Sequence, residues 1–514
     1  MLSQYRSLKK VLFLLLAIFL IIACNAVSEV PAPTSSVPTF DPNWIPPTNT
    51  IVPTATVFEV AEVTPTISSP AGFKPGDPTA TPLGNDITDP NFIEGKKAYD
   101  EERFEEAFIL LSAAIEANPD LAPAYRYRGS AYWYLGDCVS GLADEEKALS
   151  IDPNYARAWA DRALMHYCLE NYPQALLDSE MALSIDPSLA FVHHNLAVYY
   201  YKIGDYEKAL EEYSITVAID PNRASGWSGK SEALTKLGRF ENCIQDATKA
   251  IEVDPEEWLA YSDRAYCRST LGLYAAAVED YKIYLAQDGS DAVVWYNMGI
   301  SQRHVGDYEG AIDSYTTALE LDSSYYPAFI NRGFVYRTLE RYEEALDDYN
   351  RALEFGDIPL AYSGRGDTYF GLRRFEEAIA DYKKSLSLIP NDGHSYCQLS
   401  LSYFEVGRYQ DSLDAAATTN QINPSCGGQR LYETQARSYY ALGNYDQALA
   451  YMDKALAVHR YSLGYYYRGI IFHDAGRNNE AIQDLEQFLA TVESTDAYKN
   501  EIADANARLA KLKP

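Results

Sequence analysis

The sequence has little positive charge. It contains 43 Lys and Arg residues against 73 Asp and Glu residues, and its formal net charge is −30. A field of this sign repels nucleic acid and anionic lipid headgroups, which excludes both as general partners. The excess of carboxylates otherwise favours solubility and indicates little about function.

The sequence also lacks the motifs that carry catalysis. It has no Gly-rich phosphate loop, no nucleophile elbow and no HExxH helix. The seven histidines are scattered, and no spacing of cysteines and histidines is that of a zinc site. We therefore predict no enzymatic activity, no cofactor and no metal centre, and we look for the function on a surface.

The first residues have the pattern of an export signal. A short basic region is followed by an apolar run from Val11 to Ile22, which is short for a permanent membrane-spanning helix. The run ends in Ile21-Ile22-Ala23-Cys24, which resembles the lipobox of bacterial lipoproteins, although leucine is commoner than isoleucine three residues before the cysteine. The resemblance implies a signal peptide over residues 1–23, a lipid on Cys24, and an extracytoplasmic protein that contacts the bacterial cell membrane through that lipid only. An ordinary signal peptide or an uncleaved anchor is the alternative.

Residues 24–87 form a second segment with a composition of its own. They are rich in Pro, Thr, Ser and Val, hold almost no Lys or Arg, and show no helical period. Proline fixes the backbone and removes a hydrogen-bond donor, so we predict an extended, unpacked tether that holds the folded part away from the membrane. Whether its threonines carry sugars is left open by the sequence.

From residue 88 the sequence repeats itself about every 34 residues. Twelve units begin at residues 88, 122, 156, 190, 224, 258, 292, 326, 359, 393, 429 and 462. Positions 8 and 20 of the unit are small in all twelve, which lets two antiparallel helices pack closely where they cross. Position 17 is aromatic in ten units, and position 32 is a helix-stopping proline in seven, including Pro119, Pro153, Pro187 and Pro424.

This pattern closely resembles the tetratricopeptide repeat family, over about four-fifths of the chain. The resemblance implies an all-α, right-handed α-solenoid of twelve helix pairs over residues 88–494, in which each pair covers an apolar face of the preceding one. The last pair then needs a lid. Residues 495–514 carry apolar side chains at helical spacing, so we predict a capping helix there with its stripe at Tyr498, Ile502, Ala505, Leu509 and Leu512.

Two positions of the unit vary together. Position 7 is basic in seven units, and position 23 is aspartate in the same seven units and in no other. We predict an ion pair between the two helices of each of these units, which orients partly buried charges. The pairs are Arg128–Asp144, Arg162–Asp178, Lys230–Asp246, Arg264–Asp280, Arg332–Asp348, Arg365–Asp381 and Arg468–Asp484.

Apart from Cys24 the chain has six cysteines, an even number that favours pairing in an exported protein. In the repeat frame they fall into three neighbouring pairs. We predict the disulfides Cys138–Cys168, Cys243–Cys267 and Cys397–Cys426. The alternative is six buried thiols that act as small apolar residues.

In tetratricopeptide repeat proteins the concave face, formed by first-helix positions such as 2, 5, 6, 9, 12 and 13, is the usual binding surface. Position 12 is aromatic in units one to four and nine to eleven. Aromatic side chains give a large contact area at low entropic cost. We therefore predict partner contacts at Trp133, Tyr167, Tyr201, Phe370, Phe404 and Tyr440, with Tyr99 at the same position of unit one. Packing on neighbouring units is the alternative, because the whole chain is rich in tyrosine.

Units seven and eight break this aromatic series with polar residues. Position 6 is Asn297 and Asn331, position 12 is Arg303 and Arg337, and His304 follows the first arginine. Such a patch of donors suits a carboxylate or an acidic peptide. It is similar to the carboxylate-clamp members of the family, but the clamp lysines and the basic residue of the third unit are absent.

The predicted function is therefore that of a non-enzymatic scaffold that binds another protein or peptide through its concave groove. Glycan or cell-wall binding, with sugar rings stacked on Trp133 and Tyr167, is the alternative, and a passive structural spacer is a third reading. The identity of the partner and the oligomeric state are left open by the sequence.

Overall fold

The computed structural model describes residues 88–423, 426–492 and 496–513 of the chain. The predicted signal peptide (1–23), the lipidation site Cys24, the tether (24–87) and Pro424 lie outside the described residues. All regular structure in the described part is helical. The predicted all-α solenoid of twelve helix pairs with a final capping helix is confirmed.

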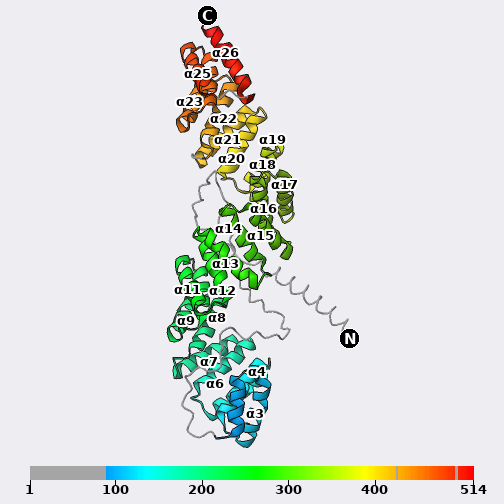
Figure 1. Cartoon of the computed structure of the whole chain (residues 1–514), viewed down its shortest axis with the longest axis vertical. Helices are drawn as coiled ribbons and strands as arrows, with labels where there is room; N and C mark the ends of the chain where they lie inside the picture. Colours follow the sequence, from blue (N-terminus) through cyan, green and yellow to red (C-terminus); the bar gives the residue numbers. More distant parts are fainter. Residues whose placement is uncertain (1–87, 424–425, 493–495, 514) are drawn as a thin grey trace, which may run out of the picture.

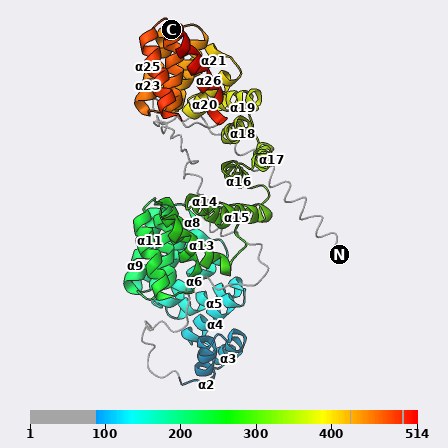
Figure 2. The same cartoon turned by 45° about the horizontal axis from the view of Figure 1, so that its top comes forward.

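The pairs follow one another in chain order along the long axis of the molecule, from α2 at one end to α26 at the other (Figures 1 and 2). The first helices of the twelve units are α2 Pro90–Asp100, α4 Ala122–Tyr134, α6 Ala156–Cys168, α8 Ala190–Lys202, α10 Ala224–Lys236, α12 Trp258–Thr270, α14 Ala292–His304, α16 Tyr326–Thr338, α18 Pro359–Gly371, α20 Gly393–Glu405, α22 Gly428–Ala441 and α24 Ser462–Asp474.

The second helices are α3 Phe104–Ala117, α5 Cys138–Ile151, α7 Tyr172–Ile185, α9 Tyr206–Ile219, α11 Phe240–Val253, α13 Tyr274–Gln287, α15 Tyr308–Leu321, α17 Tyr342–Leu353, α19 Phe375–Leu388, α21 Tyr409–Ile422, α23 Tyr445–Val458 and α25 Asn478–Thr491. A short 3₁₀ turn, η2 Asp496–Tyr498, leads into the capping helix α26 Lys499–Leu512. Leu509 and Ile502 of α26 pack against the buried Leu485 and Phe488 of α25.

The turn inside each pair has one conformation throughout. The residue at position 15 has a positive φ in all twelve units, and it is glycine in eight of them, such as Gly204 with φ +83°. The other four are Glu102, Glu170, Glu340 and Arg373, whose φ values are 58° or 59°. Glycine takes this left-handed conformation without a steric penalty, whereas Glu and Arg do not, so the fold imposes it on those four residues.

The seven predicted ion pairs between positions 7 and 23 all form. The six arginine pairs are bidentate: in unit six, for example, Arg264 Nε lies 2.9 Å from Asp280 Oδ2 and its Nη2 lies 2.8 Å from Asp280 Oδ1. Five of the arginines also donate from Nη1 to position 25 of the preceding unit, at Ser112, Thr248, Thr316, Asn350 and Asp453. The sequence pattern predicts the pair within each unit but not this link between units.

The first helices line the inner side of the solenoid. Apart from the junction of α6 and α8, each of them contacts the first helix of the next unit, from α2 and α4 at one end to α22 and α24 at the other. The second helices lie outside this row and contact mainly their own partner and the next first helix. Positions 9 and 12 therefore face a neighbouring unit across this row of first helices, here called the inner row. The residues that they meet there decide which candidate residues are free to contact a partner.

Candidate functional site

The predicted aromatic residues at position 12 are held by aromatic residues at position 17 of their own unit. The two rings lie at the turn between the paired helices, with centroids between 5.3 and 6.3 Å apart. All but Tyr99 remain half-buried. The pairs are Tyr99–Phe104, Tyr167–Tyr172, Tyr201–Tyr206, Phe370–Phe375, Phe404–Tyr409 and Tyr440–Tyr445.

Trp133 of unit two is the exception, because position 17 of that unit is Cys138. Its side chain is buried in a cluster with Cys138 and Met165. Trp133 is therefore a packing residue between units two and three, and little of its ring faces solvent. The structure thus supplies an intramolecular contact for every predicted aromatic.

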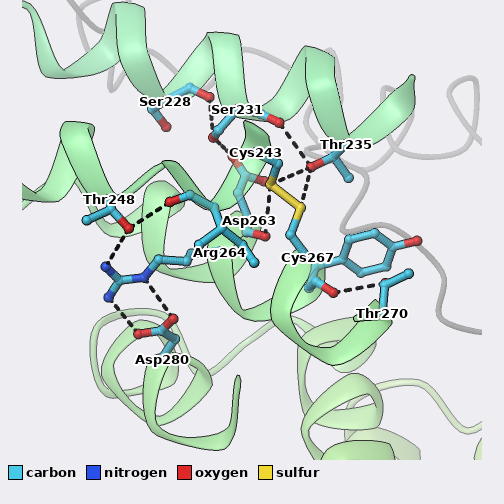
Figure 3. The surroundings of a disulfide bond; sticks show 12 residues. Ser228, Ser231, Thr235, Cys243, Thr248, Asp263, Arg264, Cys267, Thr270 and Asp280 are labelled. Carbon is cyan, nitrogen blue, oxygen red and sulfur yellow. Dashed lines mark hydrogen bonds and ion pairs between the residues drawn. A yellow bond between two sulfur atoms is a disulfide. The ribbon is translucent and has the colours of Figure 1, made fainter. Parts of the chain in front are cut away.

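Two of the three predicted disulfides are present. Cys138 is bonded to Cys168 with a Cα–Cα distance of 6.3 Å, and Cys243 is bonded to Cys267 with a Cα–Cα distance of 6.5 Å. Each joins the second helix of one unit to the first helix of the next. Figure 3 shows the Cys243–Cys267 bond beside Thr235, whose hydroxyl oxygen lies 3.2 Å from Cys243 Sγ.

The third predicted disulfide is not formed in this structure, in which Cys397 and Cys426 are free thiols. The repeat frame brought them together correctly, since both are buried in one small cluster with Ala416 and Leu431. They meet through a hydrogen bond between the two sulfur atoms and not through a covalent bond. The sequence predicts that the two cysteines lie close together, but it does not predict whether they form a disulfide.

The two asparagines of the predicted donor patch are buried. Asn297 has no exposed surface. Asn331 donates from Nδ2 to the hydroxyl of Tyr296 at 3.0 Å and to the carbonyl oxygen of Pro327 at 3.1 Å. Asn331 therefore joins units seven and eight from within the stack.

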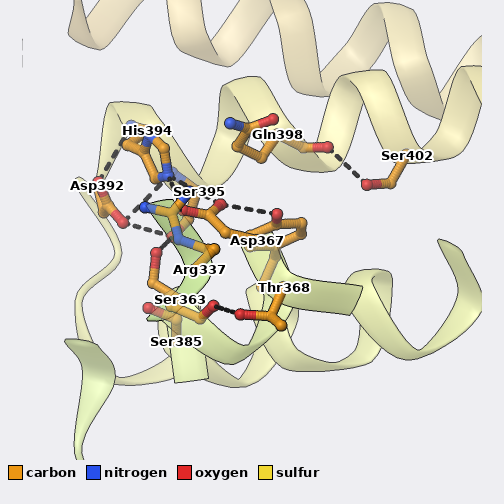
Figure 4. A network of polar contacts seen from close by, with 12 residues as sticks. Arg337, Ser363, Asp367, Thr368, Ser385, Asp392, His394, Ser395, Gln398 and Ser402 are labelled. Carbon is orange, nitrogen blue, oxygen red and sulfur yellow. Dashed lines mark hydrogen bonds and ion pairs between the residues drawn. The ribbon is translucent and has the colours of Figure 1, made fainter. Parts of the chain in front are cut away.

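Arg337 belongs to a buried ionic network that the repeat pattern does not predict. Its Nη2 lies 3.7 Å from Asp367 Oδ2, and His394 Nε2 lies 3.1 Å from Asp367 Oδ1. The hydroxyl of Tyr382 donates to the same carboxylate at 2.8 Å. Figure 4 shows Arg337, Asp367 and His394 converging from α16, α18 and α20, so that one carboxylate holds three successive units together.

The charges of this network support one another. Burial alone would raise the pKa of Asp367, but His394 and Arg337 outweigh it and lower that pKa below its usual value. Burial alone would lower the pKa of His394, but Asp367 outweighs it and raises that pKa. His394 is therefore a cation over a wider pH range than an ordinary histidine, and the network is an Arg–Asp–His salt bridge.

Arg303 has no such partner. Its side chain is buried, and within the described residues no carboxylate lies at ion-pair distance from it. Its contacts are the ring of Phe334 at 5.0 Å from its guanidinium carbon, the hydroxyl of Tyr315, and His304 Nε2 at 3.4 Å from its Nη2. Its Nε is buried without an acceptor.

His304 does not add a second charge beside Arg303. Burial, and then the charge of Arg303, lower the pKa of His304 to about 4. The imidazole is therefore neutral near pH 7 and accepts the hydrogen bond from Arg303. Its ring stacks on Tyr274 with the centroids 4.0 Å apart, which fixes its orientation.

A single contact rule explains why the two arginines differ. Position 12 of one unit faces position 9 of the next across the inner row. Arg337 thus meets Asp367, whereas Arg303 meets Phe334, whose ring centroid lies between the two guanidinium groups at 5.0 and 5.1 Å. The same rule pairs Tyr201 with Glu232 and Phe404 with Arg437. Applied to the sequence, this rule would have indicated that Arg337 pairs with Asp367 and that Arg303 meets no acidic residue in the next unit.

The described residues offer neither a metal site nor a membrane-spanning helix. No group of three or more His, Cys, Asp or Glu side chains there is placed to hold a metal ion. None of the helices in the described part is long and apolar enough to cross a membrane.

Comparison with known proteins identifies the repeat. Family profiles described as tetratricopeptide repeat match residues 190–223, 228–292, 292–325, 326–355, 359–392 and 433–509. Together these segments make up more than half of the chain. A search of curated protein sequences gave no match.

Several solved structures are similar in fold. A tetratricopeptide repeat protein from Parabacteroides merdae ATCC 43184 is 22% identical and covers 50% of this chain and 99% of its own, with a TM-score of 0.36. The APC/C hetero-tetramer Cut9–Hcn1 is 14% identical and covers 82% and 95%, with a TM-score of 0.40. YrrB, described as having an unusual peptide-binding site, is 24% identical and covers 39% and 99%, with a TM-score of 0.33. The likeness concerns the helical repeat alone.

Proposed function

The chain belongs to the tetratricopeptide repeat family, whose members typically mediate protein–protein interactions, and from this premise we propose that it is a non-enzymatic scaffold that binds a protein partner along its inner row of first helices. The proposed contact is an acidic segment or a chain-terminal carboxylate of the partner, held by Arg303 beside Phe334.

The unpaired guanidinium of Arg303 carries this proposal. A buried charge without a counter-charge is costly, and the neighbouring arginines at position 7 all have aspartate partners. A ligand carboxylate that approaches the exposed edge of the guanidinium would supply the missing charge, in the planar geometry that guanidinium binds best. The ring of Phe334 offers an apolar surface next to it for the side chain that carries or precedes the carboxylate.

The proposed site is narrower than the five-residue patch that the sequence predicts. Arg337 is already neutralised by Asp367, and Asn297 and Asn331 are buried within the stack. His304 contributes orientation and not charge. Arg303 is thus the one residue of the patch whose substitution should remove binding without first breaking an ion pair of the fold.

We also propose that the protein lies outside the cytoplasm, anchored through a lipid on Cys24. The disulfides Cys138–Cys168 and Cys243–Cys267 support an oxidising compartment, because cytosolic proteins seldom keep such bonds. Metabolic labelling with a fatty-acid analogue tests the anchor: wild type should carry the label and Cys24→Ser should not. A labelled Cys24→Ser variant, or an unlabelled wild type, would contradict it.

The binding proposal is tested with short acidic peptides and the soluble fragment from residue 88 onward. Fluorescence polarisation should detect binding of a peptide library with free C-terminal carboxylates, weakened by salt because exposed parts of the contact are screened. Arg303→Met should weaken the best binder by about 10- to 100-fold, the value of a charge-assisted hydrogen bond. Arg351→Met removes an exposed arginine and serves as the matched control.

Equal binding by wild type and Arg303→Met would refute the Arg303 site and leave the scaffold without an assigned contact. Stronger capture of cell-wall glycan than of any peptide would favour the predicted alternative of glycan binding. No contact of the position-12 aromatics points to that alternative, because each ring already packs on a neighbouring residue. Capture of neither ligand would leave the passive-spacer reading.

A further inference from the structure

The two free thiols lie where α20 begins and where the chain enters α22. Cys397 and Cys426 are 5% and 3% exposed and pack against Ala416 and Leu431. Cys426 Sγ lies 3.6 Å from the carbonyl oxygen of Gly393. Gly427 comes so close to Cys397 that a Cβ there would lie 2.7 Å from its sulfur. Each thiol is therefore fixed in position against the other.

The environment of the two thiols is not symmetric. The contact between the two thiols raises the pKa of Cys397 and lowers that of Cys426, so Cys426 is the thiol that becomes a thiolate more readily. The hydrogen bond between the two sulfur atoms is the largest influence on Cys426 and lowers its pKa; burial opposes it, and the charge of His394 lowers it further. The same hydrogen bond and burial raise the pKa of Cys397.

The charge of His394 is maintained by the network described above. Asp367 of α18 accepts from its Nε2, and Arg337 of α16 and Tyr382 of α19 complete the surroundings of that carboxylate. Asp392, in the turn before α20, also raises the pKa of His394. Arg430 of α22 lowers the pKa of Cys397, but the contact with Cys426 and burial outweigh it. A histidine cation near one of two adjacent thiols favours the thiolate of that cysteine, which is the form that reacts with an oxidant.

We propose that Cys397 and Cys426 are a reversible thiol–disulfide pair, in which hydrogen peroxide oxidises Cys426 and Cys397 then closes the disulfide. This site is independent of the binding contact at Arg303. It differs from Cys138–Cys168 and Cys243–Cys267, which are bonded.

The reaction balances in two steps. The thiolate of Cys426 attacks one peroxide oxygen, the O–O bond breaks, and the leaving hydroxide takes a proton to become water, which leaves a sulfenic acid on Cys426. Cys397 Sγ then attacks the sulfenic sulfur, its proton and the hydroxyl leave as a second water, and the S–S bond forms. Two electrons pass from the thiol pair to one peroxide.

Stabilisation of one thiolate also makes the product easy to reduce, because it favours the reduced form of the pair. Oxidation would tie the N-terminus of α20 to the start of α22 and so fix units ten and eleven relative to each other. The two inserted glycines, Gly427 and Gly428, lie at this junction. The pair is thus placed to change the stiffness of the solenoid at one joint.

The test uses the full chain, stepwise peroxide, and differential alkylation read by mass spectrometry. We expect the Cys397–Cys426 bond to form with peroxide and to open at a dithiothreitol concentration at least about tenfold lower than the other two disulfides require. Those two bonds are the internal reference. Thiols that stay alkylatable after peroxide, or a bond as resistant to reduction as the other two, would overturn the proposal.

Two variants test the order of events. In Cys397→Ser, peroxide should leave a sulfenic acid on Cys426 that dimedone traps, whereas in Cys426→Ser the remaining Cys397 should not be trapped. Asp367→Asn should lower the pKa of His394 and slow peroxide oxidation about tenfold at pH 7, with rates recovering at higher pH. Equal trapping of both cysteines, or a pH profile unchanged by Asp367→Asn, would refute the roles assigned here.

Discussion

Single residues decide the chemistry inside the stack, and Glu145 is the clearest case. It occupies position 24, which in the other units is Tyr, Leu, Met, Ala or Ser. Its side chain is fully buried, and within the described residues neither carboxyl oxygen has a hydrogen-bond partner. Burial raises its pKa well above the usual value. The group is therefore a neutral acid, because an unpaired carboxylate at this depth would be far more costly.

We expect Glu145→Gln to make the protein more stable than wild type at pH 8 and to change little at pH 4. The folded state keeps a proton that the unfolded state loses above about 4.5, so wild-type stability falls as the pH rises from there toward the folded pKa. The fall is at most roughly 1.4 kcal/mol per pH unit. Denaturant midpoints measured from pH 4 to pH 8 check this.

The control for Glu145→Gln is Glu146→Gln, because Glu146 is the exposed neighbour on the same helix. Glu146→Gln should keep the pH dependence of the wild type. If the midpoints of wild type and Glu145→Gln fell in parallel with pH, Glu145 would be ionised in the folded protein, and its assignment as a neutral acid would be wrong.

At the scale of the element, each helix pair is held by the small residues at its crossing, and seven of the twelve pairs also by the ion pair between positions 7 and 23. In unit eight, Arg332 makes two hydrogen bonds to Asp348, at 2.7 and 2.8 Å, and a third to Thr316 of unit seven. The side chains are 16% and 6% exposed. At this burial the pair fixes the geometry of the two helices. Removing one partner lowers the stability more than removing both, because it leaves a buried charge unpaired.

A double-mutant cycle on Arg332→Met and Asp348→Leu measures this. We expect each single variant to lower the free energy of unfolding by about 3 kcal/mol, because it leaves a buried charge unpaired. The double variant should lose less than the sum of the two. Arg374 and Glu377, an exposed pair on one turn of helix, form the matched control and should contribute below about 1 kcal/mol. Additive losses in unit eight would contradict the coupling.

At the scale of the whole molecule, the stability of each unit depends on its contacts with the adjacent units. Each unit contacts the units beside it, and ionic or aromatic links along the inner row, such as Arg337–Asp367–His394, reinforce particular joints. The last unit has a neighbour on one side only, so α26 takes the place of the next pair. It covers Leu485 and Phe488, which have no exposed surface.

We expect Leu509→Asp to loosen the C-terminal end and to leave the other end unchanged. A charge in the face that α26 presents to α25 would uncover the apolar surface of the last unit, and in a linear stack this disturbance fades within a few units. Amide hydrogen exchange should rise in α24 and α25 but not in α4 and α5. Lys511→Asp, on the exposed side of α26, is the control. Faster exchange along the whole chain would show a single cooperative unit instead.

The sequence by itself determined the repeat, its register, the two helices of each unit, the capping helix and the ion pairs within units. These depend on contacts between residues at fixed spacing, and twelve copies of one pattern show that spacing directly. Arg264 and Asp280 could be paired from the sequence because both lie in one unit and vary together with the same positions of six others.

Only the tertiary structure decided which residues of the inner row are available. Arg303 and Arg337 occupy the same position of adjacent units, yet Arg337 is neutralised by Asp367 while Arg303 faces Phe334. The difference lies in the next unit, across a contact between position 12 and position 9 that a single repeat does not reveal. Cys397 and Cys426 were likewise placed together by the repeat, but their hydrogen bond and the nearby cation of His394 depend on three units meeting at one point.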